Sequence, residues 1–136
     1  MENKLRLDIV TPYGSVLSED VDEFAAPGTE GEFGVFPGHA PFVTTLKTGI
    51  ITYKKESEVG YIFVSGGYAG VRQDGGLVLA DSAERSEGID VERARAAMKR
   101  AEERLKQAEK IDFVRAQAAL ERATIRVQVA EKHSAR

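Results

Sequence analysis

Five arginines in the C-terminal third of the chain are spaced so that their guanidinium groups can act together. Arg115, Arg122 and Arg126 are separated by seven and four positions, so on a helix they share one face. Arg93 and Arg100 share a face in the same way. Guanidinium forks that converge from two helices can bind a triphosphate or a row of carboxylates. The alternative is a solvated face on which the arginines pair with nearby glutamates, namely Glu102, Glu103 and Glu121.

The rest of the chain offers few residues for catalysis or metal binding. It has no cysteine, and its two histidines, His39 and His133, are far apart in the sequence. A thiolate nucleophile and a cysteine-based zinc site are therefore excluded, and two isolated histidines argue against another metal centre. A small jelly-roll enzyme would need a cluster of His, Asp or Glu that the sequence does not show. A binding or structural role is favoured over catalysis.

The first 88 residues show a hydrophobic period of two. Leu5, Leu7 and Ile9 alternate with charged residues, as in a strand with one buried and one wet face. Glycine-rich breaks separate further runs of this kind, which are GIITYKK, GYIFVSGG, YAGVRQ and LVLADS. Asp74-Gly75-Gly76 predicts a tight hairpin, because glycine accepts the backbone angles of short turns. Many short strands with no helical pattern between them predict an antiparallel sandwich or flattened barrel.

The pattern changes at Ile89. From Asp90 to Glu131 there is no proline or glycine, and apolar residues recur at helical spacing. Asp90 and Asp112 are expected to cap two helices. Their apolar stripes are Ala94, Ala97, Met98, Ala101, Leu105 and Ala108 on the first helix, and Ala116, Ala119, Leu120, Ala123, Val127 and Ala130 on the second. A short connection predicts an antiparallel hairpin, so residues 1–88 and 89–136 are expected to form two domains.

Alanine dominates both stripes, which has consequences for how firmly the helices pack. Alanine has the best intrinsic helix propensity, so each helix can persist alone. A buried methylene contributes roughly 0.8 kcal/mol, so an alanine seam stabilises packing far less than a leucine seam. The hairpin is therefore either an element with two arrangements a few kcal/mol apart, or a permanent alanine-lined hairpin on a core.

Charge changes sign at the same boundary. Residues 1–89 carry seven Lys and Arg against fourteen Asp and Glu, whereas residues 90–136 carry twelve against eight. The basic segment either leans on an acidic surface, its own or a partner's, or both segments are solvated. The acidic first segment and the net charge of −3 argue against nucleic-acid binding. With no signal-peptide pattern and no apolar run of about eighteen residues, neither export nor a membrane span is expected.

Four stretches carry a resemblance to a known family. GEFGVFPGHAPFVTTLKTG, VSGGYAGVR, LVLADSAE and IDVERA occur in this order, and together they resemble the epsilon subunit of bacterial and chloroplast F-type ATP synthases. The similarity runs from Leu5 to about Glu131. It implies an α+β fold, with an N-terminal antiparallel β-sandwich of about ten short strands followed by a C-terminal two-helix hairpin. No Ser- and Arg-rich transit segment precedes the sequence, so a bacterial source is expected.

The resemblance also implies a function. Such subunits are not catalytic and require no cofactor. The sandwich binds the gamma subunit and sits on the ring of c subunits, so that it rotates with the central stalk during proton-driven ATP synthesis. The hairpin lies against the sandwich or extends toward the alpha and beta subunits, where it restrains ATP hydrolysis. The complex would hold the chain as a peripheral protein at the cytoplasmic face of the bacterial cell membrane.

Contact residues follow from the same resemblance. Glu32 and His39 match positions that contact the c ring, and we expect Phe33 and Phe36 to anchor their loop in the core. The alternative for His39 is a turn residue bonded to its own backbone. The basic face suited to an acidic segment of beta consists of Arg100, Arg115, Arg122 and Arg126.

Some bacterial epsilon subunits bind ATP as a regulatory ligand in the folded hairpin, with or without magnesium. Their motif is Ile or Leu, Asp, two variable residues, Arg and Ala. The matching residues here are Ile89, Asp90, Arg93 and Ala94, with Glu84, Arg122 and Arg126 at the wider site. Bound ATP would hold the hairpin folded and relieve inhibition. Similar residues occur in members that bind ATP poorly, so the motif leaves ATP sensing open.

Overall fold

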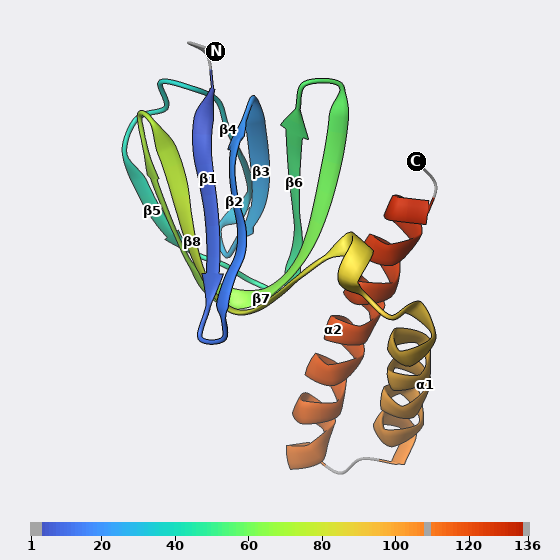
Figure 1. Ribbon diagram of the computed structural model, residues 1–136. Helices are drawn as coiled ribbons and strands as arrows, with labels where there is room; N and C mark the ends of the chain where they lie inside the picture. The colour runs from blue at the N-terminus through green and yellow to red at the C-terminus, as the bar shows by residue number, and fades with distance from the viewer. Residues whose placement is uncertain (1–3, 108–109, 135–136) are drawn as a thin grey trace. The chain divides into compact units, whose positions relative to one another are not determined.

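The computed structural model describes residues 4–107 and 110–134, and the chain divides into two compact units. The regular elements of the described residues are strands in the first unit, Met1–Arg85, and helices in the second, Ser86–Arg136 (Figure 1). The second unit begins with a short 3₁₀ turn, η1 (Ser86–Gly88), and Ile89 directly follows it. The change from strand pattern to helix pattern seen in the sequence therefore coincides with a change of secondary structure.

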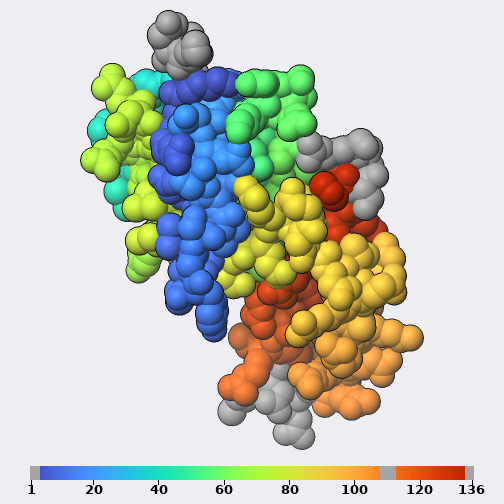
Figure 2. Space-filling model, viewed as in Figure 1, coloured from blue at the N-terminus to red at the C-terminus, as the bar shows by residue number. Residues whose placement is uncertain are grey.

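Eight strands build the first unit. They are β1 (Leu5–Thr11), β2 (Gly14–Val21), β3 (Glu23–Gly28), β4 (Gly31–Val35), β5 (Phe42–Thr45), β6 (Gly49–Lys55), β7 (Glu58–Arg72) and β8 (Gly75–Arg85). Neighbouring strands follow the order β2-β1-β8-β7-β6-β3-β4, and β5 also pairs with β7. In Figure 2, the blue β1 and β2 lie side by side on the surface next to the yellow-green β7–β8 segment.

The predicted count of ten strands is too high, because β7 and β8 are long. β7 has 15 residues, and its first half pairs with β6 while its second half pairs with β5. Gly66 and Gly67 lie between the halves with φ of 70° and 113°. They bend the strand, yet the register with β8 is the same on both sides of the bend. The sequence left either a turn or a bulge open at Ser65-Gly66-Gly67, and the structure has a bend inside one strand.

One strand pair is an exception in a sandwich whose other described pairs are antiparallel, as expected. β1 and β8 are parallel, with Arg6 opposite Gly75 and Val10 opposite Leu79. No tight turn joins these strands, so chain connectivity does not force them to run in opposite directions. A period of two is the same in both orientations, and the sequence pattern could not separate them.

The buried residues of the sandwich come from the predicted alternation. Leu5, Leu7 and Ile9 are all buried and belong to one hydrophobic cluster with residues of the other strands. The described members of this cluster lie between Leu5 and Ala83. The predicted hairpin between β7 and β8 is present, but its two-residue turn is Gln73-Asp74; Gly75 and Gly76 belong to β8 and neither has a positive φ, so their predicted place in the turn is wrong.

Two helices form the second unit, α1 (Val91–Gln107) and α2 (Lys110–Ser134). Asp90 caps α1 as predicted, because its Oδ1 accepts a hydrogen bond from the Arg93 backbone N–H at 3.1 Å. Its carbonyl oxygen also accepts from the Ala94 N–H at 2.9 Å. The prediction for Asp112 is wrong, because α2 begins at Lys110 and Asp112 lies inside the first turn. Aspartate is favoured in a first turn as well as at a cap, so residue type alone does not fix where a helix begins.

The seam between the helices is lined with alanine, as the stripes predicted. Ala94, Ala101, Ala116, Ala123, Val127 and Ala130 are buried, while Ala97, Met98, Leu105, Ala119 and Leu120 are half-buried. Ala108 lies outside the described residues. Val129 is fully buried although it was not part of the predicted stripe. Arg95 on α1 reaches Glu131 on α2 at 3.5 Å, so an ion pair also links the two helices.

Candidate functional site

The outer face of the sandwich carries exposed apolar side chains on three neighbouring strands. Val43 on β5 lies opposite Gly70 on β7, which lies opposite Leu77 on β8. In the next row Tyr68 lies opposite Leu79. Val43 is 78% exposed, and Tyr68, Leu77 and Leu79 are each 45% or more exposed. We call Val43, Tyr68, Leu77 and Leu79 the apolar strip; apolar side chains gathered in this way mark interaction surfaces more often than scattered ones do.

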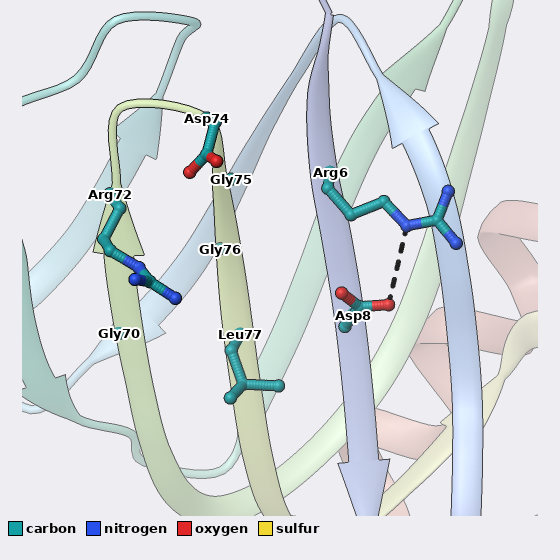
Figure 3. Close-up of a pocket in the computed structure, with 8 residues that line it drawn as sticks. All are labelled: Arg6, Asp8, Gly70, Arg72, Asp74, Gly75, Gly76 and Leu77. Atoms are coloured by element: carbon teal, nitrogen blue, oxygen red, sulfur yellow. Dashed lines mark ion pairs between the residues drawn. The ribbon is translucent and has the colours of Figure 1, made fainter.

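Charged residues on β1 and β2 border the apolar strip and bind one another. Arg6 lies 3.7 Å from Asp8, a pair drawn in Figure 3. It also lies 3.3 Å from Asp20 and donates a hydrogen bond to Ser18 at 2.6 Å. Ser18 in turn donates to Asp8 at 2.5 Å. Arg72 on β7 makes no comparable contact with a residue of the described part of the chain. A guanidinium group beside the apolar strip is therefore available to a partner.

Sequence reasoning missed the apolar strip, although a signal was present. In LVLADS every one of the first four positions is apolar, and Val78 and Ala80 point into the core while Leu77 and Leu79 point outward. An unbroken apolar run of this kind is typical of a strand that is covered on both faces. Strict alternation would have left the outward positions polar.

The predicted c-ring residues lie on β4 and in the loop that follows it. Glu32 is exposed on β4, opposite Pro27 of β3. His39 is half-buried in the loop, and its Nδ1 lies 2.6 Å from the Ala40 carbonyl oxygen. This contact is the backbone bond expected from the alternative interpretation of His39. Gly38, at φ 84°, donates its backbone N–H to the Gln73 carbonyl at 3.0 Å, which holds the loop to the β7–β8 turn.

Only one of the two predicted aromatic anchors points toward the core. Phe33 packs against the hydrophobic cluster, and its ring lies 5.1 Å from that of Phe42 in an edge-to-face arrangement. Phe36 is 58% exposed, so its predicted anchoring role is wrong. β4 ends at Val35, and Phe36 is out of phase with Phe33 and Val35, which share one side of the strand.

A carboxylate on β2 ties three strands of the sandwich together. Glu19 accepts a hydrogen bond from Lys55 on β6, and its other oxygen lies 3.0 Å from Arg85 on β8. The Lys55 hydrogen bond, helped by the positive charges of Lys55 and Arg85, lowers the pKa of Glu19. The same bond raises the pKa of Lys55. These groups pair with one another across three strands, so they form a structural cluster, although the buried Nε of Arg85 has no hydrogen-bond partner among the described residues.

The residues of the predicted ATP motif have visible structural roles. Ile89 and Ala94 are buried, and Asp90 caps α1. Arg93 is exposed. Glu84 belongs to the strand unit, whereas the other motif residues belong to the helical unit. A structural explanation therefore exists for three of the matched residues, and it is independent of nucleotide.

The arginines of the predicted basic face differ in how exposed they are. Arg100 on α1 and Arg115 on α2 are exposed, while Arg122 and Arg126 are half-buried. The first two present their guanidinium groups to water in this arrangement of the hairpin. Among residues 4–107 and 110–134, no group of three or more His, Asp or Glu side chains is placed to hold a metal ion. None of the described helices has the length and apolar character needed to cross a bilayer.

Two family models together match nearly the whole chain. One, described as ATP synthase, Delta/Epsilon chain, beta-sandwich domain, matches residues 4–86. The other, described as ATP synthase, Delta/Epsilon chain, long alpha-helix domain, matches residues 87–131. The chain belongs to the ATP synthase delta/epsilon chain family. Membership confirms the resemblance and makes the chain a non-catalytic subunit of an F-type ATP synthase.

Individual members of the delta/epsilon family are similar over most of this chain. The ATP synthase epsilon chain of Thermodesulfovibrio yellowstonii is 57% identical over 108 residues, which cover 79% of this chain and 77% of that one. The epsilon chain of Geobacter sulfurreducens is 52% identical over 107 residues, covering 79% and 78%. A chain in the Euglena gracilis mitochondrial ATP synthase OSCP/F1/c-ring structure superposes with a TM-score of 0.79 at 23% identity, covering 98% of this chain and 82% of that one. That structure shows a shared fold.

Proposed function

We propose that this chain is a rotor subunit of a bacterial ATP synthase, in which its sandwich binds the gamma subunit and its hairpin restrains ATP hydrolysis. The apolar strip is the observation that supports this most directly. Apolar side chains that lie together on a sheet face gain free energy when a partner covers them, at about 25 cal/mol per Å². Family membership supports gamma as that partner. In this complex the subunit is peripheral, at the cytoplasmic face of the membrane.

The loop between β4 and β5 is our proposed contact with the ring of c subunits. Gly38 and His39 are both held by backbone hydrogen bonds, to Gln73 and Phe36 respectively. A loop that is already held loses less conformational entropy when it binds. This property suits Glu32 and His39 to a contact that must persist while the rotor turns.

Titration of purified gamma with this chain tests the role of the apolar strip. Leu77→Asp places a charge in the strip without entering the core, and we expect it to weaken binding at least tenfold. Glu58→Gln, on the exposed start of β7, is the matched control and should bind like the wild type. If the wild-type chain does not bind gamma under gentle conditions, the proposed rotor role is wrong.

The hairpin is proposed to inhibit hydrolysis in the complex through its basic face. Arg100 and Arg115 are exposed and can meet carboxylates of alpha or beta. Omitting residues 89–136 from the reconstituted complex should raise its rate of ATP hydrolysis. Equal rates with and without the hairpin would contradict this part of the proposal.

Nucleotide regulation rests on the matched motif and on the two half-buried arginines of α2. Calorimetric titration of the chain with ATP and magnesium tests it, and Arg126→Gln should abolish any heat that comes from a triphosphate contact. Asp90→Asn keeps a side-chain oxygen for the cap and removes the charge, so it separates the capping role from a nucleotide role. Absence of binding at millimolar ATP would leave the motif with its structural role alone.

A further inference from the structure

A hollow interrupts the apolar strip at Gly70. Val43 and Leu77 lie on either side of this residue in one row of the sheet. A Cβ atom added at Gly70 would meet nothing within 4 Å, and the residue is not among those with positive φ. Neither backbone conformation nor close packing therefore requires glycine here. The missing side chain leaves open space between the apolar side chains of Val43 and Leu77.

The hollow extends from Gly70 across the next strand. Its volume is about 210 Å³, and a second glycine, Gly75, forms part of its floor. Leu77 forms an apolar wall, Arg6 and Asp8 on β1 form a polar end, and Asp74 lies at the turn beside Arg72. Figure 3 shows Arg72 reaching from β7 toward β8, beside these residues. The space thus combines one apolar wall with charged side chains, of which the guanidinium of Arg72 lies nearest to Gly70 in the chain.

Some of the charged side chains around the hollow already form ion pairs and hydrogen bonds with described residues, and others do not. Arg6 and Asp8 pair with each other, and Ser18 and Asp20 hold them further. Arg72 is exposed, and neither it nor Asp74, the remaining charged residue of the lining, has a side-chain ion pair or hydrogen bond to any described residue. Its guanidinium plane is therefore free to stack on an incoming group.

We propose that gamma inserts one aromatic side chain into the hollow at Gly70, with its ring against Leu77 and the guanidinium of Arg72 over its face. This inference rests on the proposed function, since it names what gamma presents at the apolar strip. An enclosed cavity of about 150 Å³ accommodates benzene, and this hollow, which is open to solvent, has about 210 Å³, enough space for a phenylalanine or tyrosine ring to enter from outside. Arginine stacks favourably on aromatic faces. Aromatic side chains that fill pockets near the centre of an interface carry much of its binding energy.

Filling the hollow is the direct test. Gly70→Leu places a side chain where the ring would lie, and we expect it to weaken gamma binding at least tenfold in a titration. Gly34→Leu is the matched control, because Gly34 on β4 also has open space around its Cβ position and lies outside the apolar strip. It should bind within twofold of the wild type. Thermal unfolding of both variants checks that the sandwich is intact.

A compensation experiment identifies the inserted residue. Each aromatic residue of gamma is replaced by alanine in turn, and each variant is titrated with the wild-type chain and with Gly70→Leu. One gamma variant should bind the wild type weakly and bind Gly70→Leu at least fivefold better, because leucine then fills the vacated space. If no gamma variant is rescued, the aromatic occupant is wrong.

The accessibility of position 70 to an alkylating reagent gives an independent measurement. The chain has no cysteine, so Gly70→Cys supplies a single thiol. Its alkylation should slow at least tenfold when gamma is bound, whereas Gly34→Cys should react equally in both states. Failure of the wild type to bind gamma would overturn the proposed function. Normal binding that Leu77→Asp weakens but Gly70→Leu leaves unchanged or tightens would overturn this inference alone.

Discussion

Glu19 joins strands that are not paired with one another in the sheet. Its carboxylate contacts Lys55 on β6 and Arg85 on β8, whereas its own strand, β2, pairs only with β1 among the described strands. Its side chain is about a quarter exposed, so water screens the charges less than at an open surface. The cluster therefore helps to close the sandwich where backbone hydrogen bonds do not.

We predict that Glu19→Gln lowers the free energy of unfolding by ~1 kcal/mol at pH 7. Because the pKa of Glu19 is lowered in the folded state, this stabilisation is present above the pKa of the unfolded chain and is lost as the pH falls through the folded pKa. The difference from the wild type should therefore shrink below about pH 4. Urea unfolding at pH 7, 4 and 2.5 measures it.

Lys55 sets the upper end of the pH range over which its pair with Glu19 stabilises the folded chain. Its pKa is raised, so its contribution is present below the unfolded pKa and is lost as the pH rises through the folded value. Glu58→Gln, at an exposed position of β7, is the control and should leave stability unchanged. A difference between Glu19→Gln and the wild type that is equally large at pH 2.5 would show that packing, not charge, is responsible.

Single aromatic residues show the limit of sequence reasoning at this scale. Phe33 and Phe36 occupy the same turn-rich stretch, and composition gives both the same tendency to be buried. Only strand phase separates them, and that phase depends on where β4 ends. Leu77 and Leu79 pose the same difficulty, because an apolar residue that faces a partner has the same sequence signature as one that faces the core.

At the scale of elements, Asp90 determines where α1 begins. Asp90→Ala removes the acceptor for the Arg93 N–H, so we predict a loss of about 1 kcal/mol in helix stability. Asp90→Asn should keep most of it. Hydrogen exchange at the Arg93 and Ala94 amides measures the change, and exchange should accelerate in the alanine variant only. Equal exchange in all three proteins would mean that the cap adds nothing.

The alanine seam allows a second prediction at this scale. Ala123→Leu adds volume where α1 and α2 pack closely, and overpacking typically costs about 1–3 kcal/mol. We expect the folded hairpin to lose population to an opened form. Spin labels on cysteines introduced at Lys99 and Gln128, both exposed, would report longer distances.

Ala96→Leu is the control for the alanine seam, because Ala96 is an exposed alanine of α1. It should leave the distance distribution unchanged. If Ala123→Leu also leaves the distribution unchanged, the hairpin is permanently closed and cannot act as a movable inhibitor. That outcome would favour the second of the two interpretations of its alanine stripes.

For the whole molecule, we predict that residues 1–88 fold without the hairpin. The buried cluster of the sandwich draws its described members only from the first unit, so removing the helices takes nothing out of it. Thermal unfolding of the truncated chain should remain a single cooperative transition, and its far-ultraviolet spectrum should be that of a β protein. A truncated chain that is unfolded at 25 °C would contradict this prediction.

The division into a strand unit and a helical unit could be predicted from the sequence, because the hydrophobic period of a segment depends only on residues close together in the chain. A period of two gave Leu5, Leu7 and Ile9 as core residues, and a helical period gave the alanine seam. The parallel pairing of β1 with β8 was not accessible, since it joins residues far apart in the chain. The hollow at Gly70 was not accessible either, because it depends on which residues of three strands lie in one row.

The β1–β8 pairing also constrains how the protein is made. Arg6 is translated early, but its partner Gly75 emerges only when almost all of the sandwich has been synthesised. Until then β1 has one edge without a neighbour, and pairing between distant segments is slow. A nascent chain with an open strand edge is prone to aggregate. Ribosomal stalling before β8 should therefore give an intermediate that depends on chaperones. Stalling after the helical hairpin of α1 and α2 has been synthesised should not.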